Sequence, residues 1–161
     1  MAVVTDDVVF YQSISADSLG GAIDTIRVPQ SLNLYFNEVE LEEAQTGSVA
    51  YRCFYVQNDN ATDTLTAAEI FISVLTPNPN TFCELGLGTA GLNGTEQTVS
   101  GENIAPVGVT FDATDTSTPL VIGDLAAGDN FPIWIRRTVE AQAFGQSSDQ
   151  VIVTVRGDGG L

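Results

Sequence analysis

The spacing of the apolar residues constrains the fold of this chain more than any other feature. No stretch longer than about ten residues keeps a helical period, whereas short β-branched and aromatic runs recur between clusters of Gly, Asn, Asp, Thr and Pro. This pattern is typical of all-β proteins. We therefore predict an antiparallel β-sandwich, of jelly-roll or immunoglobulin-like type, with a possible extended N-terminal arm.

Each run that is rich in β-branched and aromatic residues predicts a strand. The expected strands cover residues 3–12, 24–28, 31–36, 49–57, 67–75, 81–87, 95–100, 107–112, 119–123, 130–141 and 149–156. In residues 130–141 the alternation places Ile133 and Ile135 on one face and Trp134 on the other, because successive side chains of a strand point to opposite faces. One short helical piece or acidic loop is expected at residues 37–44.

The first 30 residues differ from the rest of the chain. Residues 13–21 are small and turn-rich, and Pro29 interrupts the pairing pattern. Two interpretations stay open: a first hairpin of the sandwich, or an arm that adds a strand to the sheet of a neighbouring chain. We therefore divide the chain into residues 1–30, the arm or hairpin, and residues 31–161, the sandwich. The arm residues expected to contact a partner are Val3, Val4, Val8 and Phe10.

The charged residues exclude much familiar chemistry. The 161 residues include 21 acids and five arginines, but no lysine and no histidine. A Ser-His-Asp or Cys-His pair is excluded without histidine, and a Schiff base is excluded without lysine. A net charge of −16 is unfavourable for binding nucleic acid or anionic membranes. The N-terminus resembles no secretory signal, so no export is predicted.

Carboxylates are the abundant reactive groups, and they permit two chemistries: glycoside hydrolysis by a paired Asp and Glu, and calcium binding. The acidic run at residues 38–43 indicates a solvated face. Residues 58–63 offer oxygen ligands without the spacing of an EF-hand, which favours a polar turn. Cys53 and Cys83 are expected to be buried thiols rather than a disulfide. We therefore assign no catalytic residue, metal ligand or cofactor.

Because the chain has no lysine and no histidine, arginine makes all of its cationic side-chain contacts. The guanidinium group is suited to bidentate pairing with carboxylates. Arg136 and Arg137 point to opposite faces of their strand, so one of them can hold acidic loops of its own domain while the other meets a neighbour. Alternatively, both form internal salt bridges. Trp134 is either a platform for a sugar ring or packed under a loop. The partner-binding candidates outside the arm are Arg52, Trp134, Arg136 and Arg137.

Three segments carry a family resemblance. Residues 128–139, Gly-Asp-Asn-Phe-Pro-Ile-Trp-Ile-Arg-Arg-Thr-Val, followed by a turn and residues 149–157, resemble the C-terminal part of small virion structural proteins of tailed bacteriophages. Residues 47–58, Gly-Ser-Val-Ala-Tyr-Arg-Cys-Phe-Tyr-Val-Gln-Asn, resemble these proteins too. With residues 105–111 between them, the similarity covers roughly residues 35–157.

The resemblance implies a non-enzymatic decoration or cement protein on the outer surface of the phage capsid, made in the host cytoplasm. Its partner would be the major capsid protein, and each copy would bridge capsomers and stabilise the assembled shell. By analogy, copies are expected to form homotrimers at local three-fold positions. A tail or baseplate component is one alternative, and a carbohydrate-binding β-sandwich module is another.

Overall fold

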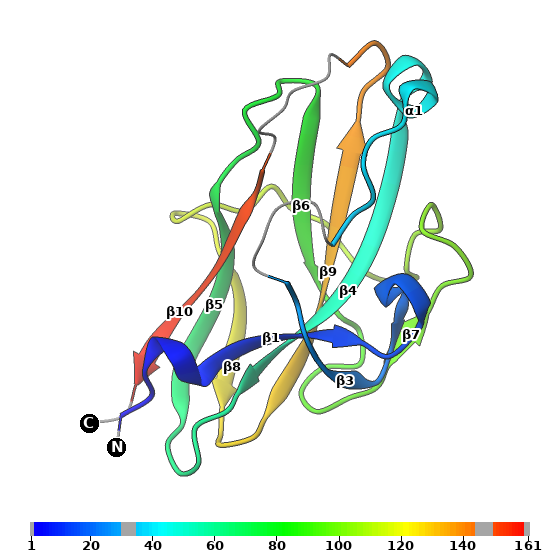
Figure 1. Cartoon of the computed structure of the whole chain (residues 1–161). Helices are drawn as coiled ribbons and strands as arrows, with labels where there is room; N and C mark the ends of the chain where they lie inside the picture. The colour runs from blue at the N-terminus through cyan, green and yellow to red at the C-terminus, as the bar shows by residue number, and fades with distance from the viewer. Residues whose placement is uncertain (1, 30–34, 144–149, 160–161) are drawn as a thin grey trace.

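The computed structural model describes residues 2–29, 35–143 and 150–159, and Figure 1 shows the whole chain. Antiparallel strands dominate, with one short α-helix among the described residues, α1 (Leu41–Thr46). Two short 3-10 helices cover Thr5–Asp7 and Ala16–Ser18. The strands are β1 (Val8–Ser13), β2 (Gly20–Gly21), β3 (Ile23–Arg27), β4 (Ser48–Asn58), β5 (Leu65–Val74), β6 (Thr81–Leu87), β7 (Glu96–Thr98), β8 (Leu120–Leu125), β9 (Asn130–Val139) and β10 (Ile152–Gly159).

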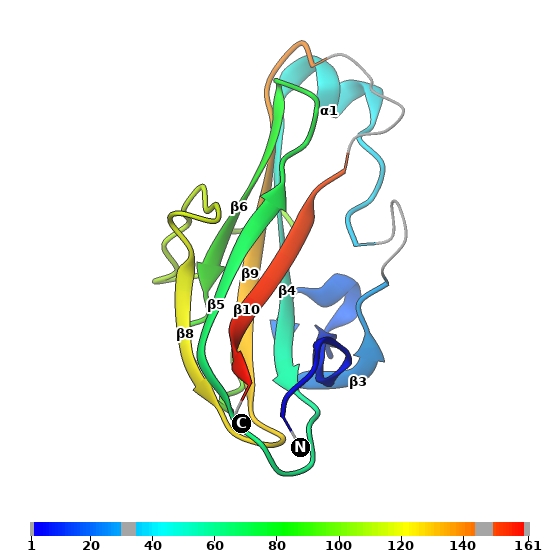
Figure 2. The same cartoon turned by 90° about the vertical axis from the view of Figure 1, so that its left-hand side faces the viewer.

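The strands form two main sheets that lie in two layers. The large sheet has the order β3-β1-β4-β9-β6, the small sheet has the order β10-β5-β8, and β2 pairs separately with β7. In Figure 2 the small sheet lies in front of the large one. All the described pairings are antiparallel, which confirms the predicted all-β fold class. The choice between a jelly-roll and an immunoglobulin-like topology stays a prediction.

The main hydrophobic core joins the two sheets. Alternate residues of β4 and β9 point toward the small sheet, because side chains of a strand alternate between its faces. The buried residues of this core are Phe54, Val56, Leu65, Ala68, Ile70, Ile72, Cys83, Leu85, Leu125, Ile133 and Ile135. Ile133 and Ile135 therefore share one face of β9, as their alternation predicted. We call this side of the large sheet its inner face.

A second, smaller core covers the outer face of the large sheet. Its buried residues are Tyr51, Cys53, Tyr55, Val99 and Trp134. Val109 and Phe111 pack against them from the loop that follows β7. The Tyr55 hydroxyl donates to the carbonyl of Gly21 at 2.6 Å and accepts from the N–H of Glu96 at 3.0 Å, which ties β2 and β7 to β4. Both faces of the large sheet are therefore covered at its centre.

The described part of the N-terminal region extends the large sheet. β1 pairs with β4 from Val8 opposite Asn58 to Gln12 opposite Phe54, and β3 pairs with the outer edge of β1. The Phe10 ring packs edge-on against that of Phe54, with the ring centroids 5.4 Å apart. β1 and β3 thus form a hairpin on their own chain. The division of the chain at residue 30 stays a prediction.

Several element boundaries differ from the predicted ones. The strand expected at residues 107–112 is absent from this described region apart from one bridge between Leu85 and Asp112. Here the chain leaves the sheet and packs Val109 and Phe111 over the outer face instead. The strand expected at residues 31–36 lies largely outside the described residues. The expected helical piece is α1, which Gly47 ends with a φ of +83°.

The sandwich has two ends of different construction. β4, β6 and β10 begin at the same end as β5 and β9 finish, and α1 lies there too, at the top of Figure 1. We call it the distal end. The opposite end carries the turn at 59–64, between β4 and β5, and the turn at 126–129, between β8 and β9. We call it the proximal end.

Candidate interaction surface

All five arginines contact groups of their own chain. Four of them form ion pairs with carboxylates: Arg27 with Asp59 at 3.6 Å, Arg52 with Glu102 at 2.6 Å, Arg156 with Glu69 at 2.7 Å, and Arg136 with Glu84. The fifth, Arg137, donates from Nη1 to the carbonyl oxygen of Asn37 at 2.7 Å. The cationic groups predicted to meet a partner are therefore used inside the fold.

Arg52 is a buried structural residue. It projects from the inner face of β4, and only 2% of it is exposed. Its Nε donates to the carbonyl of Tyr35 at 3.2 Å, and its Nη1 donates to the carbonyl of Tyr51 at 3.0 Å. Its Nη2 donates to the Glu102 carboxylate. The prediction that Arg52 contacts a partner is thus wrong for the folded chain, because Arg52 is buried and its donors face backbone groups and a carboxylate of its own chain.

Arg137 lies beside Arg52 on the same face of the large sheet. It stands opposite Ala50 in the β4–β9 register, two positions from Arg52. The Phe36 ring lies near both guanidiniums, with its centroid 4.8 Å from that of Arg137 and 5.4 Å from that of Arg52. Burial lowers the pKa of Arg137, because the charged form loses solvation. Arg137 therefore holds the segment that carries Phe36 and Asn37, and its contact with a partner stays a prediction.

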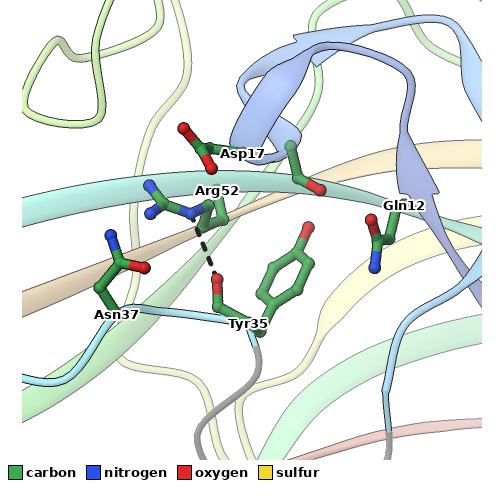
Figure 3. A pocket seen from close by; sticks show the side chains of 6 residues that line it. Gln12, Asp17, Tyr35, Asn37 and Arg52 are labelled. Carbon is green, nitrogen blue, oxygen red and sulfur yellow. Dashed lines mark hydrogen bonds between the residues drawn. The ribbon is translucent and has the colours of Figure 1, made fainter.

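The segment 35–37, which we call the strap, is held against the inner face by these two arginines. Besides the contacts of Arg52 and Arg137, the Tyr35 hydroxyl donates to the carbonyl of Cys53 at 2.5 Å. Figure 3 shows Tyr35, Asn37 and Arg52 together, with the hydrogen bond from Arg52 to Tyr35. Burial raises the pKa of Tyr35 well above its usual range, so this hydroxyl stays protonated and donating.

Arg136 occupies the outer face, opposite in direction to Arg137, as predicted from the alternation. Its Nε donates to the Glu84 carboxylate at 2.7 Å, and its guanidinium lies 5.0 Å from the centroid of the Phe111 ring. Glu84 faces Arg136 in the β6–β9 register. Arg136 thus fixes the loop that carries Phe111 to the sheet, and its expected role as a partner contact stays a prediction.

A polar hollow lies beside the strap (Figure 3). It measures about 210 Å³, and its lining residues are Gln12, Asp17, Ser18, Tyr35, Asn37 and Arg52. Asp17 and Ser18 have positive φ angles of 56° and 54°, which place the Asp17 side chain on the rim. The guanidinium in the hollow already makes three hydrogen bonds. The hollow therefore offers polar groups, and the Arg52 donors among them already bond to Tyr35, Tyr51 and Glu102.

Trp134 is fully buried, with 0% of it exposed. It belongs to the second core, where Val99, Val109 and Phe111 cover it. The interpretations of Trp134 as a sugar platform and as a partner contact are therefore wrong for this fold. The alternative, packing under a loop, describes its position, because the loop after β7 folds back over the outer face.

The four predicted arm residues divide between surface and core. Val3, Val8 and Phe10 are partly buried and pack against the main core. Val4 is exposed, and its N–H donates to Oδ2 of Asp7 at 2.9 Å. Three of the four side chains thus contribute to the fold of their own chain, and contact with another chain stays a prediction for all four.

The polar groups of the turn at 58–63, considered as a calcium loop, bond to one another and to Asp7 and Leu125. The Asn58 amide donates to the carbonyls of Asp63 and Leu125, and the Asn60 amide donates to Asp7. Within the described residues, no three carboxylate or thiol groups gather as a possible metal site. Cys53 and Cys83 are both buried, as predicted, and form no disulfide. Burial strongly raises the pKa of the Cys53 thiol, so it is a packing group rather than a nucleophile.

Sequence reasoning missed the partners of the arginines. Phe36, Glu84 and Glu102 give no local signal, because their contacts with Arg137, Arg136 and Arg52 depend on strand pairing and on loops distant in sequence. Glu84 can be identified as the partner of Arg136 only when β6 is known to pair with β9.

Across the described ranges, no helix combines the length and the apolar character that crossing a bilayer requires. No protein-family model, no curated protein and no solved structure matches the chain.

Proposed function

We propose that this chain is a non-enzymatic structural protein of a tailed-phage virion, which decorates the head and stabilises it by bridging neighbouring capsomers. The proposal places it on the outer surface of the capsid, bound to the major capsid protein, with self-association as a homotrimer. An acidic β-sandwich that docks through its surface, without active-site chemistry, suits that role.

One observation carries the proposal: all five arginines contact groups of their own chain. Only four of the 21 carboxylates pair with arginine in the described part of the chain. The charge presented outward is thus overwhelmingly negative. Such a surface repels packaged nucleic acid, keeps the protein soluble at high concentration, and favours basic or polar protein surfaces.

The segments that resemble phage virion proteins form the centre of the large sheet and the cover of its outer face, and this placement supports the proposal. Residues 47–58 and 128–139 correspond to β4 and β9, which pair with each other over their whole length at the centre of the large sheet. The third segment, residues 105–111, includes Val109 and Phe111, which cover Trp134. The resemblance therefore concerns residues that build the sandwich and its covered outer face.

Binding of the purified protein to empty phage heads tests the proposed function. Purified protein is mixed with empty heads assembled from the major capsid protein encoded near this gene, and the mixture is sedimented through a gradient. We expect saturable co-sedimentation, and a higher temperature of head rupture, because a ligand of the assembled state stabilises it by mass action. Absence of binding would overturn the proposal. Labelled protein found on tails in micrographs would favour the tail or baseplate alternative instead.

A further inference from the structure

Asn93 and Gly94 form the single Asn-Gly pair in the sequence. Asparagine is chemically labile, and a following glycine favours loss of its side-chain amide, because a residue without Cβ lets its backbone nitrogen approach the asparagine Cγ. Asn93 is exposed to water. Packing requires the glycine, since a Cβ at residue 94 would lie 2.3 Å from the carbonyl oxygen of Ala90. The fold therefore retains a labile pair at this position.

The chemistry of this pair needs only water. The backbone nitrogen of Gly94 attacks Cγ of Asn93, so that a new N–Cγ bond forms and the Cγ–Nδ2 bond breaks. The amide proton of Gly94 leaves with the Nδ2 group as ammonia, and a succinimide ring remains. Water then opens the ring on either side, which gives aspartate or isoaspartate at residue 93. One side-chain amide is thus exchanged for one carboxylate, with one water consumed and one ammonia released.

The folded chain opposes the first step of this reaction. Nδ2 of Asn93 donates to Oδ1 of Asp129 at 2.6 Å, and Oδ1 of Asn93 accepts from the N–H of Asn130 at 2.9 Å. These two bonds fix the orientation of the carboxamide. The attacking nitrogen is occupied as well, because the N–H of Gly94 donates to the carbonyl of Gly91 at 3.1 Å. The attack therefore requires that these hydrogen bonds open.

The product does not suit the same contact. An acid at residue 93 replaces the donor Nδ2 by an acceptor oxygen, which would face Oδ1 of Asp129 where a hydrogen bond now lies. Two carboxylates at this distance repel each other. The Asp129 carboxylate is itself held in place, because its Oδ2 accepts from the N–H of Ala126 at 3.0 Å. Loss of the amide would thus weaken the contact between the loop that carries Asn93 and the turn at 126–129.

We infer that Asn93 is a covalent modification site that the fold keeps closed. The side-chain amide survives while Asp129 and Asn130 hold it, and it is lost from chains in which this contact is open. Once formed, the carboxylate opposes renewed closure, so the reaction leaves a permanent chemical record of local or global unfolding. This inference goes beyond the proposed function and does not depend on what the protein binds.

Mass spectrometry measures the modification in the full-length protein. The wild type is incubated at one pH and temperature in buffer and in guanidinium chloride, and peptide mapping locates each amide that is converted to an acid. We expect Asn93 to convert at least about tenfold more slowly in buffer, because the reaction needs an opened state. Asn103, which is exposed but precedes Ile104, should convert slowly in both solutions. Equal rates at Asn93 in the two solutions, or no conversion in guanidinium chloride, would overturn the inference.

Two variants test the protection that Asp129 provides. Asp129→Ala removes the acceptor of the Asn93 amide, so the rate in buffer should rise toward that of the unfolded chain. Asp115→Ala should keep the slow rate, because it removes a carboxylate that accepts from the N–H groups of Ser117 and Thr118 in a different turn. Circular dichroism checks that both variants are folded. If the two variants react equally slowly, Asp129 does not protect the amide and the inference is wrong.

The effect of the product is tested by substitution. Asn93→Asp should lower the urea midpoint by roughly 0.5 M, because it replaces a hydrogen bond by a repulsion. Combining Asn93→Asp with Asp129→Asn should restore most of the midpoint, since the amide and the carboxylate then exchange places. Asn103→Asp adds the same charge at an exposed position and should change little. A midpoint of Asn93→Asp equal to that of Asn103→Asp would show that the carboxylate does not oppose closure.

Discussion

The two ends of the sandwich complete the same sheets in different ways. At the proximal end, the fully buried Asn58 donates to the carbonyls of Asp63 and Leu125 at 2.8 and 2.9 Å and accepts from the N–H of Asn60. Across the neighbouring turn, Asn93 donates to Asp129 at 2.6 Å and accepts from the N–H of Asn130. The polar groups of these turns thus satisfy one another.

The distal end has a comparable turn between β5 and β6, where the buried Asn78 accepts from the N–H of Asn80 at 3.0 Å and the N–H of Glu140 donates to the carbonyl of Asn80 at 2.8 Å. Leu41 and Leu75 project from an α-helix and from a strand end with most of their surface accessible. Buried asparagines thus close turns at both ends, and the ends differ in the apolar area that Leu41 and Leu75 leave exposed at the distal one. A substitution of an exposed distal leucine should therefore cost less stability than a substitution of a fully buried proximal residue.

The largest effect is expected at the proximal end from Asn58→Ala. The change removes the amide that bonds the carbonyls of Asp63 and Leu125 and the N–H of Asn60, which should lower the free energy of unfolding by about 3 kcal/mol. Urea unfolding measures this change in the free energy of unfolding. The matched control, Asn103→Ala at an exposed position, should change little. Equal effects of the two substitutions would mean that the proximal turns are not closed by Asn58.

A smaller loss is expected where the strap meets the large sheet. Arg52→Met removes the donors to Tyr35, Tyr51 and Glu102, which should cost about 2 kcal/mol in the free energy of unfolding. The control is Arg27→Met, because the Arg27 pair with Asp59 is exposed and 3.6 Å long, and such pairs contribute little. If both arginines cost the same amount, the strap is not held by Arg52.

We expect low pH to destabilise the proximal end through protonation of the Asp7 carboxylate. The N–H of Val4 and then the Asn60 amide hold the pKa of Asp7 below its usual value of 3.8, since both donate to the ionised form. A lowered folded pKa contributes stability above the unfolded value, and this contribution is lost as the pH falls through the folded value. Between about pH 5 and about pH 2, urea midpoints of Asp7→Asn should therefore fall less steeply than those of the wild type.

A matched change near Asp7 checks that assignment. Asp6→Asn is the control, because it removes the same charge while leaving the contacts of Asp7 with Val4 and Asn60 in place. Parallel pH profiles for wild type and Asp7→Asn would show that the contacts of Asp7 do not contribute to stability.

The smallest effect is expected at the distal end. Leu75→Ser should change the free energy of unfolding by less than about 0.5 kcal/mol, because the side chain is already largely in water. Leu65→Ser, where β5 begins at the proximal end, buries a hydroxyl in the main core and should be strongly destabilising. Urea unfolding of both variants compares the two ends of one strand. A large loss for Leu75→Ser would remove the distinction between the ends.

The sequence supported the parts of this fold that depend on local alternation. The strand at 130–139 and the face shared by Ile133 and Ile135 follow from a period of two, which acts over neighbouring residues. The turn-rich segments also separate the strands largely where Gly, Asn, Asp and Pro predicted. The all-β class could therefore be predicted without any long-range information.

The contacts of the candidate site could not be predicted in the same way. Trp134 is buried because residues 99–111 fold back across the sheet, and Arg52 is paired because Glu102 lies in that returning segment. The concentration of Leu41 and Leu75 at one end depends on where antiparallel strands begin and finish. Each of these facts joins residues distant in sequence, for which a single sequence offers no periodic signal.

The cover over Trp134 makes the outer face separately observable by fluorescence. Trp134 is the single tryptophan of the chain, and it lies in the second core rather than between the two sheets. Its emission and its quenching by acrylamide therefore report opening of the loop that carries Val109 and Phe111. Circular dichroism reports the sandwich as a whole. A difference between the two unfolding curves would reveal that the cover opens before the sheets separate.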